Sequence, residues 1–280
     1  MSQPRRQAIG QVPAWIVAFI ILVMVAGPML WAVSTSLKTE VDAVKFPPVL
    51  LPSSPTFQAY LDVFTHTTFM IELFNSVLYA AGAVIVSLLV GIPSGYAAAR
   101  LTFRGKGTLL LVILATSMIP GVALLVPTYY VLDRLGLLNN AIVVVIISAT
   151  RLLPQTVWFV KDFVDAVPPE IDEAAMVDGA SRGQILRKMI LPLIRPGIAA
   201  IGVLGVISTW NDYITVAVFA PAAESRTLQV ALVDQVFDSV GISWSYTLAF
   251  AIVASMPIVM LFMLTQRWFI AGLTAGAAKG

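Results

Sequence analysis

Six long apolar stretches limit what this 280-residue chain can fold into. Each is close to the roughly twenty residues that a helix needs to cross about 30 Å of hydrocarbon. The expected spans are about 14–34, 74–98, 108–131, 140–160, 196–218 and 246–266. Only 11% of the residues are charged, whereas a soluble domain has roughly 25%. The sequence therefore predicts an all-α membrane protein with six transmembrane helices.

Lys and Arg gather on one side of these spans. With the N-terminus in the cytoplasm, the inner segments hold most of the 17 basic residues, namely Arg5, Arg6, Arg100, Arg104, Lys106, Lys161, Arg182, Arg187, Lys188, Arg195, Arg267 and Lys279. The outer segments hold Lys38, Lys45, Arg134 and Arg226. Cytoplasmic loops carry the excess of Lys and Arg, so both termini are expected in the cytoplasm. No small-residue cleavage site follows the first apolar run, so we expect that run to stay as a helix.

The sequence lacks the residues and motifs that several kinds of chemistry require. The chain has no cysteine and a single histidine, His66, so neither a thiol site nor a His-based metal site is expected. It contains no Gly-x-x-x-x-Gly-Lys-Ser/Thr, and Gly105-Lys106-Gly107 is only a short basic turn, so it should not hydrolyse ATP itself. A net charge of +2 gives no reason to expect a nucleic-acid partner.

A charged, amphipathic segment at 167–196 interrupts the apolar pattern. Pro168 and Pro169 suit a first helical turn, and the acidic residues Glu170, Asp172 and Glu173 suit its positive end. Gly179 is placed to end that helix. Ser181 and Gln184 form a capping box that starts a second helix, expected to run to about Leu191. The sequence thus predicts a helix–turn–helix outside the lipid, between the fourth and fifth spans.

This segment resembles the cytoplasmic coupling loop of type I ABC importer permeases, the membrane subunits of ATP-driven uptake systems. The residues in register with the family pattern are Glu173, Ala174, Ala175, Gly179, Leu191 and Pro192. Met189 stands where the family has isoleucine. The resemblance implies that these residues, together with Asp178, contact an ATPase subunit, and that Ala174 and Ala175 permit its close approach. The alternative is a solvated amphipathic loop that only links two spans.

Polar residues at membrane depth are candidates for a translocation path or gate. Asp212 lies about 16 residues after Pro196, roughly 24 Å along a helix, which places Asn211 and Asp212 in the outer part of the fifth span. Ionisable groups inside a membrane usually face a bundle interior or an aqueous path. Asp212 could instead lie among lipid headgroups. Arg151, in the fourth span, could line a path or pair structurally with a carboxylate.

Other segments narrow the resemblance to the carbohydrate-uptake branch, specifically the second membrane subunit of maltose-type importers. The matching segments are Asn75-Ser76, the run from Tyr96 to Arg100, Ile119-Pro120, Trp210-Asn211-Asp212 and the tail from Gln266 to Gly280. The resemblance implies a heterodimer with a second homologous permease, two ATP-binding subunits that hold ATP and Mg, and an extracytoplasmic solute-binding protein. It also implies a multi-pass protein of a bacterial or archaeal plasma (inner) membrane, in contact with lipid and without a cofactor of its own. In the family the tail reaches between the ATPase subunits; a frayed end is the alternative.

The expected organisation has three parts. Residues 1–70 form the N-terminal tail, first span and outer loop; 71–266 form the ABC transmembrane type-1 domain, with the coupling loop at about 167–192; and 267–280 form a cytoplasmic tail. Gly91 and Gly95 should permit close helix contact. The prolines inside the spans, among them Pro120 and Pro154, are expected to be kinks rather than breaks.

Two other functions fit parts of the pattern. One is an importer of a different solute class, such as amino acids or phosphate. The other is an ion-coupled secondary transporter, which should show an internal repeat and membrane-embedded carboxylates. Asp212 is the only clear candidate for such a carboxylate.

Overall fold

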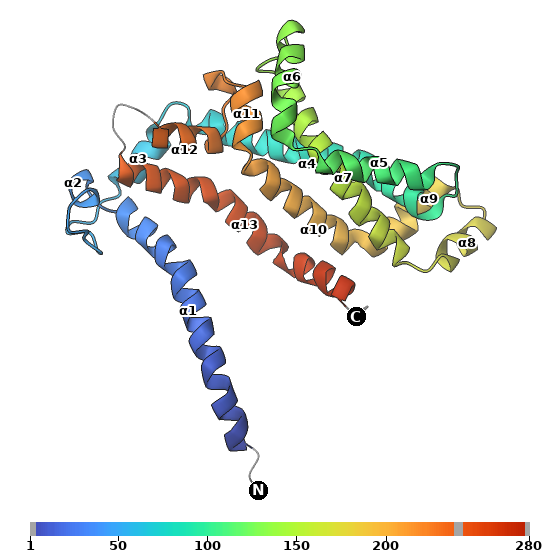
Figure 1. The fold of residues 1–280 in the computed structure, drawn as a ribbon, viewed down its shortest axis with the longest axis horizontal. Helices are drawn as coiled ribbons and strands as arrows, with labels where there is room; N and C mark the ends of the chain where they lie inside the picture. Colours follow the sequence, from blue (N-terminus) through green and yellow to red (C-terminus); the bar gives the residue numbers. More distant parts are fainter. Residues whose placement is uncertain (1–3, 238–242, 278–280) are drawn as a thin grey trace. The chain divides into compact units, whose positions relative to one another are not determined.

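The computed structural model describes residues 4–237 and 243–277, and that part of the chain is helical and contains no strand. The elements, labelled as in Figure 1, are α1 (Pro4–Ser36), α2 (Glu40–Ala43), α3 (Gln58–Thr65), α4 (Phe69–Arg100), α5 (Lys106–Met118), α6 (Gly121–Arg134), α7 (Ala141–Asp165), α8 (Glu170–Val177), α9 (Arg182–Ile185), a π turn (Leu186–Ile190), α10 (Leu191–Trp210), α11 (Tyr213–Phe219), a 3-10 turn (Ala223–Ser225), α12 (Leu228–Phe237) and α13 (Trp244–Ala277).

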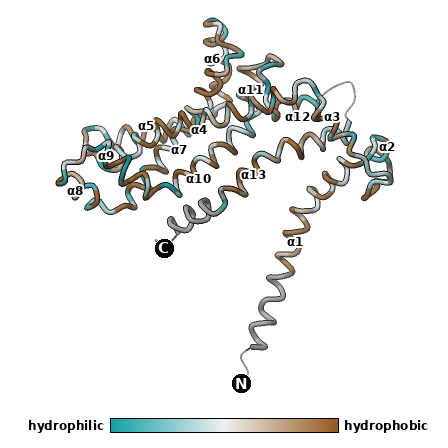
Figure 2. Tube along the Cα trace, turned by 180° about the vertical axis from the view of Figure 1, so that it is seen from behind, coloured by the Kyte–Doolittle hydropathy of each residue, from teal (hydrophilic) through white to brown (hydrophobic). Residues whose placement is uncertain are grey.

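Five helical segments are long and apolar enough to cross a membrane. They are Ile16–Ser36, Phe69–Arg100, Ala141–Asp165, Arg182–Trp210 and Trp244–Gln266. The pair α5 and α6 makes a sixth if it is counted as one span. Figure 2 shows long hydrophobic stretches in α4, α10 and α13, and hydrophilic residues along α8 and α9. The all-helical prediction is confirmed, with five or six spans.

The third expected span is not one helix. α5 and α6 meet at an angle of 90°, so Pro120 marks a break and the expectation of a mere kink is wrong. A proline disfavours helical backbone in the residue before it, and Ile119 is indeed extended, with φ −72° and ψ 121°. Pro154, in contrast, lies inside the continuous helix α7, as expected.

The fifth expected span also has different ends. Its helix starts within residues 167–196, the coupling segment, and continues through the π turn into α10. The second helix of the predicted helix–turn–helix therefore does not stop near Leu191. It ends at Trp210 rather than near Val218. Asp212 is extended (φ −79°, ψ 96°) and its side chain accepts a hydrogen bond from the Thr215 N–H, which starts α11. Asp and Asn side chains compete in this way for backbone groups and favour such breaks.

The chain divides into two compact units, Met1–Phe69 with Asp234–Ser255, and Met70–Val233 with Met256–Gly280. In the first unit, Glu40 reaches the start of α13: its Oε1 accepts hydrogen bonds from Ser243 Oγ (2.5 Å) and from the backbone N–H (3.1 Å) and hydroxyl of Ser245. Burial alone raises the pKa of Glu40, but the hydrogen bonds from the two serines outweigh it and hold the pKa below its usual value.

The second unit is built on close packing between α4, α7 and α10, which lie together in Figure 1. Gly95 shows how close the approach is, because a Cβ there would lie 2.6 Å from the Cβ of Val160 and 2.9 Å from the carbonyl oxygen of Val157. The prediction that the Gly91 and Gly95 pair permits close helix contact is confirmed.

The first turns of α4 hold the segment that follows α11. Asn75 Nδ2 donates to the carbonyl oxygens of Glu224 (2.8 Å) and Arg226 (2.9 Å). Ser76 Oγ accepts from the Leu228 N–H at 2.9 Å, and Tyr79 Oη donates to the Ser225 carbonyl at 3.1 Å. The Asn75-Ser76 pair singled out in the sequence therefore satisfies backbone groups that no regular helix would satisfy.

α13 continues through the boundary placed at residue 267 and ends at Ala277. The last three residues of the predicted tail lie outside the described residues.

Candidate functional site

The coupling segment has the predicted local structure up to its second helix. α8 ends at Val177, and Gly179 reverses the chain with a φ of +81°, a conformation open to glycine. The capping box is present: Gln184 N–H donates to Ser181 Oγ (3.4 Å) and Ser181 N–H donates to Gln184 Oε1 (2.8 Å). The prediction of a helix, a glycine turn and a second capped helix is confirmed.

One face of this segment is buried in the core of the second unit. Ala175 (3% exposed), Ile185 and Ile190 (both 0%) join one hydrophobic cluster. The other members of that cluster come from α4, α7, the segment before α8, and α10: Tyr96, Val160, Val164, Val167, Ile194 and Ile201. Ala175 thus faces the core and, of the two alanines expected to permit close approach of a partner, only Ala174 has an exposed side chain.

A buried ion pair fixes α8 to the end of α4. Arg100 Nε donates to Asp172 Oδ2 at 2.9 Å, and the two side chains are only 9% and 5% exposed. Tyr96 Oη donates to Asp172 Oδ1 at 2.8 Å, and Arg100 Nη2 donates to the Val167 carbonyl at 2.7 Å. Both carboxylate oxygens are therefore satisfied, as a buried charge requires.

Sequence reasoning missed this pair, because it treated Asp172 only as an acidic residue suited to a helix N-terminus. Two signals pointed to it. Asp172 lies three residues before Ala175, on the same helix face as that buried alanine. Tyr96 and Arg100 lie four residues apart, so they share a face near the end of α4.

The opposite face of the coupling segment is open. The predicted residues Glu173, Ala174, Asp178 and Gly179 are exposed, and Val177 is 88% exposed. A hollow of about 260 Å³ lies beside them, lined by Asp178, Gly179, Ala180, Gln184, Ile185, Lys188 and Met189. Pro192 is exposed and Leu191 is half-buried at the start of α10. The segment thus has an anchored inner face and an outer face with both apolar and charged groups.

The structure brings Arg151 and Asp212 together. Arg151 Nη1 donates to Asp212 Oδ2 at 2.5 Å and to Thr215 Oγ1 at 2.8 Å. The Arg151 side chain is 54% exposed and that of Asp212 is 11% exposed. Both line a cavity of about 320 Å³ between α6, α7 and the start of α11. Arg151 therefore pairs with a carboxylate, one of the two roles expected of it, and also lies in the wall of a cavity.

Asn211 is exposed, and its Nδ2 donates to the Ile207 carbonyl at 2.9 Å. It is not part of the cavity wall.

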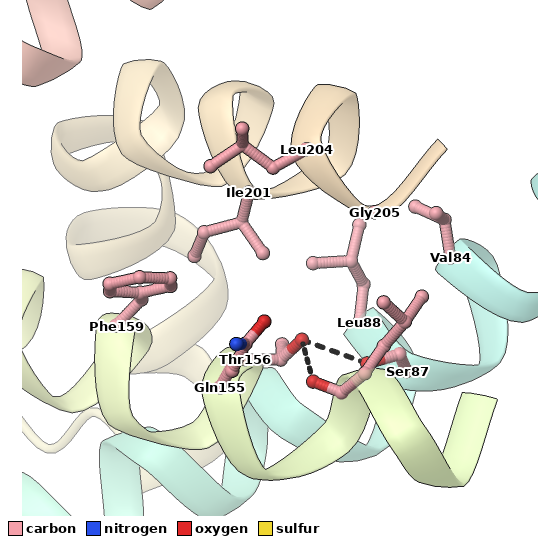
Figure 3. Close-up of a pocket in the computed structure, with 10 residues that line it drawn as sticks. Val84, Ser87, Leu88, Gln155, Thr156, Phe159, Ile201, Leu204 and Gly205 are labelled. Atoms are coloured by element: carbon pink, nitrogen blue, oxygen red, sulfur yellow. Dashed lines mark hydrogen bonds between the residues drawn. The ribbon is translucent and has the colours of Figure 1, made fainter. Parts of the chain in front are cut away.

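A second, smaller cavity lies between α4, α7 and α10 (Figure 3). Ser87 and Thr156 join their hydroxyls across its floor at 2.8 Å, and Thr156 also donates to the Leu152 carbonyl at 3.0 Å. Its volume is about 50 Å³, far below the roughly 300–1,000 Å³ of small-molecule sites. The polar pair therefore serves helix packing, as such pairs do in membranes.

The match to known proteins covers both the cavity and the coupling segment. Residues 87–274 match the family described as "Binding-protein-dependent transport system inner membrane component". The chain belongs to this family. Both Arg151 and Asp172 lie inside the matched range, so each is part of the permease domain itself.

Curated relatives are similar along nearly the whole permease. The diacetylchitobiose uptake system permease protein DasC of Streptomyces coelicolor is 31% identical over 277 residues, covering 99% of this chain and 100% of the relative. The trehalose transport system permease protein SugB of Mycobacterium tuberculosis is 32% identical, covering 90% and 92%. The sulfoquinovosyl glycerol transport system permease protein SmoH of Agrobacterium fabrum is 30% identical, covering 97% and 95%.

Solved structures show the same fold. A chain of a bacterial ABC transporter involved in the import of the acidic polysaccharide alginate superposes with a TM-score of 0.83 at 24% identity, covering 96% of this chain and 99% of that one. A chain of the MetNI methionine ABC transporter superposes with a TM-score of 0.56 at 17% identity, covering 72% and 94%. The permease is therefore a multi-pass inner membrane protein with the fold of ABC importer membrane subunits.

Proposed function

We propose that this permease forms half of the translocation pathway of an ATP-driven importer for a sugar, oligosaccharide, polyol or glycerol-phosphate derivative. A second, homologous permease is its membrane partner, two separate subunits bind ATP and Mg, and an extracytoplasmic solute-binding protein delivers the solute. In this proposal both termini and the coupling segment lie in the cytoplasm. The chain itself is not an enzyme.

The observation that carries the proposal is the two-sided coupling segment. Its inner face is fixed to α4, α7 and α10 by the buried cluster and the Arg100–Asp172 pair. Its outer face exposes Glu173, Ala174, Asp178 and Gly179 beside a hollow. A partner that binds this outer face can therefore transmit force directly to the helices. An amphipathic helix that docks in a groove of a partner is a common mode of recognition.

The sugar class is supported by the relatives, whose names refer to diacetylchitobiose, trehalose and sulfoquinovosyl glycerol. Arg151 and Asp212 are proposed to belong to the pathway or its gate, because Arg151 lies within the α7 span and pairs with Asp212, just past the end of the α10 span, beside a cavity. Asn211, exposed next to them, is proposed as a further pathway residue.

Reconstitution tests the proposal. The permease is purified with the second permease, the ATPase and the binding protein, and uptake of labelled trehalose and diacetylchitobiose into proteoliposomes is measured. We expect uptake that needs ATP and the binding protein, and ATP hydrolysis that rises when binding protein and sugar are both present. The isolated chain should hydrolyse no ATP.

The same transport assay distinguishes the two alternative functions, a secondary transporter and an importer of a different solute class. Uptake by the isolated chain driven by an ion gradient would show a secondary transporter. ATP-dependent uptake of methionine, with no uptake of either sugar, would retain the importer and refute the sugar class.

A further inference from the structure

The cavity of about 320 Å³ beside Arg151 contains more hydrogen-bonding capacity than the permease itself uses. Arg151 spends Nη1 on Asp212 and Thr215, while its Nε and Nη2 donate to no group among residues 4–237 and 243–277. A guanidinium carries five N–H donors in a planar fork. Since the side chain is 54% exposed, the unused donors are accessible from the open space.

Three threonines add further groups to the wall. Thr128 of α6, Thr150 of α7 and Thr215 of α11 all line the cavity. Thr150 donates to the Ile147 carbonyl at 2.7 Å, and Thr215 accepts from Arg151, so both keep lone pairs. The Thr128 hydroxyl makes no hydrogen bond within the described part of the chain. The rest of the wall is glycine, aliphatic residues and Phe219, which gives the mixture typical of small-molecule sites.

The net charge of the cavity wall determines which class of solute fits. Arg151 is neutralised by Asp212, whose two oxygens are both engaged, one by Arg151 and one by the Thr215 N–H. The cavity therefore has no net charge from this pair, and it offers donors from the guanidinium and acceptors from the threonines. Hydroxyl groups, which both donate and accept, complement such a wall better than an anion does. The volume is at the lower end of the roughly 300–1,000 Å³ found for ligand pockets, which suits a small solute.

We infer that this cavity is a solute-binding subsite for a neutral polyhydroxylated molecule, a sugar of one or two rings or a polyol. Arg151 binds its hydroxyl oxygens through Nε and Nη2, and Thr128 and Thr150 bind further hydroxyls. Asp212 does not touch the solute; it holds the guanidinium in place. The inference rests on the proposed function and deepens it, since it places solute contacts in this permease itself.

Single cysteines test the subsite, because the natural chain contains none. Thr128→Cys and Thr150→Cys put one thiol in the cavity wall, and Ser54→Cys puts one in the exposed loop before α3, outside the candidate spans. Each variant is assembled into the importer, with its ATPase and binding protein, and labelled with a water-soluble methanethiosulfonate. The mass of this chain reports labelling, and the probe is whichever of trehalose and diacetylchitobiose the unmodified importer takes up.

At about ten times the half-saturating sugar concentration, we expect labelling of Thr128→Cys and Thr150→Cys to slow about tenfold, as occupancy of the site requires. Ser54→Cys should be labelled at an unchanged rate. Adding Arg151→Lys, which keeps the charge but loses the planar fork, should abolish the protection.

Unchanged labelling of both wall cysteines in an importer that transports the sugar would overturn the subsite and leave the proposed function intact. Equal protection of Ser54→Cys would also overturn it, since a general loss of access to the reagent would then explain the effect. An importer that takes up methionine and neither sugar refutes the proposed sugar class instead.

Discussion

Removal of the Asp172 carboxylate should release the coupling segment from the permease. Asp172 and Arg100 are 5% and 9% exposed, and Asp172 also accepts from Tyr96. Taking away one partner of a buried pair leaves the other charge uncompensated, at a cost of about 3–5 kcal/mol. Since each 1.4 kcal/mol is a factor of ten, the opening equilibrium of α8 in Asp172→Ala should rise by about one hundred to several thousandfold.

Hydrogen exchange of the purified permease measures this opening directly. The amides of α8 should exchange faster in Asp172→Ala by that factor, while amides in the middle of α4 should not change. Asp165→Ala is the matched control. It breaks the ion pair with Lys161, which lies within one helix and whose carboxylate is 43% exposed, so its cost should be only about 0.3–0.5 kcal/mol.

A double variant separates the lost charge from lost packing. Replacing both partners, as in Arg100→Met with Asp172→Leu, removes the uncompensated charge and should recover much of the protection of α8. Exchange of α8 in Asp172→Ala that matches the Asp165→Ala control would refute the reasoning, because the buried pair would then contribute no more than a surface pair.

Three further predictions concern single residues. Gly179→Val puts a β-branched side chain at φ +81° and should abolish co-purification with the ATPase or sugar uptake, while membrane insertion stays normal. The control Gly183→Ala, in the same segment but with helical backbone, should be harmless. Normal complex yield and uptake in Gly179→Val would contradict the coupling role. Asp212→Ala removes the ion-pair partner of Arg151 and the N-cap of α11, and the cap is worth about 1 kcal/mol. Initial uptake rates should fall several-fold in Asp212→Ala, with Asp212→Glu intermediate. Wild-type uptake rates in Asp212→Ala would remove Asp212 from the pathway. Because the folded-state pKa of Glu40 is lowered, the stability that its carboxylate contributes is present above the ordinary pKa of 4.5 and is lost as pH falls through the folded pKa. Hydrogen exchange at the start of α13 should therefore accelerate in that acidic window, and Glu40→Gln should remove this pH dependence. An unchanged pH profile of exchange in Glu40→Gln would count against the role of Glu40.

The sequence predicts those features that depend on local chemistry. The turn at Gly179 follows from the need for positive φ, and the capping box of Ser181 and Gln184 follows from the free N–H groups at a helix start. The close packing at Gly95 follows from the spacing of small residues. Each of these needs only neighbouring residues, or one helix face, to specify it.

Features that depend on contacts between residues far apart in the sequence could not be predicted from local patterns. The Arg100–Asp172 pair joins residues that are 72 positions apart: helix spacing shows which face of its own helix each residue occupies, but not that the two faces meet. The second helix of the segment was expected to stop near Leu191 and the next span to begin near residue 196, but the helix continues through the π turn into α10, with Pro192 in the first turn of α10 and Pro196 inside it. The break at Asp212 depends on a capping bond that competes with an equally plausible continuous span.

The two candidate sites are joined by the same two helices, and this gives the proposed coupling a physical route. α7 carries Arg151 near its middle and Val164 at its end, about 20 Å away along the helix at roughly 1.5 Å per residue. α10 begins beside Ile190 in the coupling core and ends just before Asp212. Each helix therefore has one part packed against the coupling segment and another part at the ion pair. We propose that a partner that shifts the coupling segment moves α7 relative to α10, and that the Arg151–Asp212 bond, which joins α7 to the residue just past α10, is where such a movement would be felt.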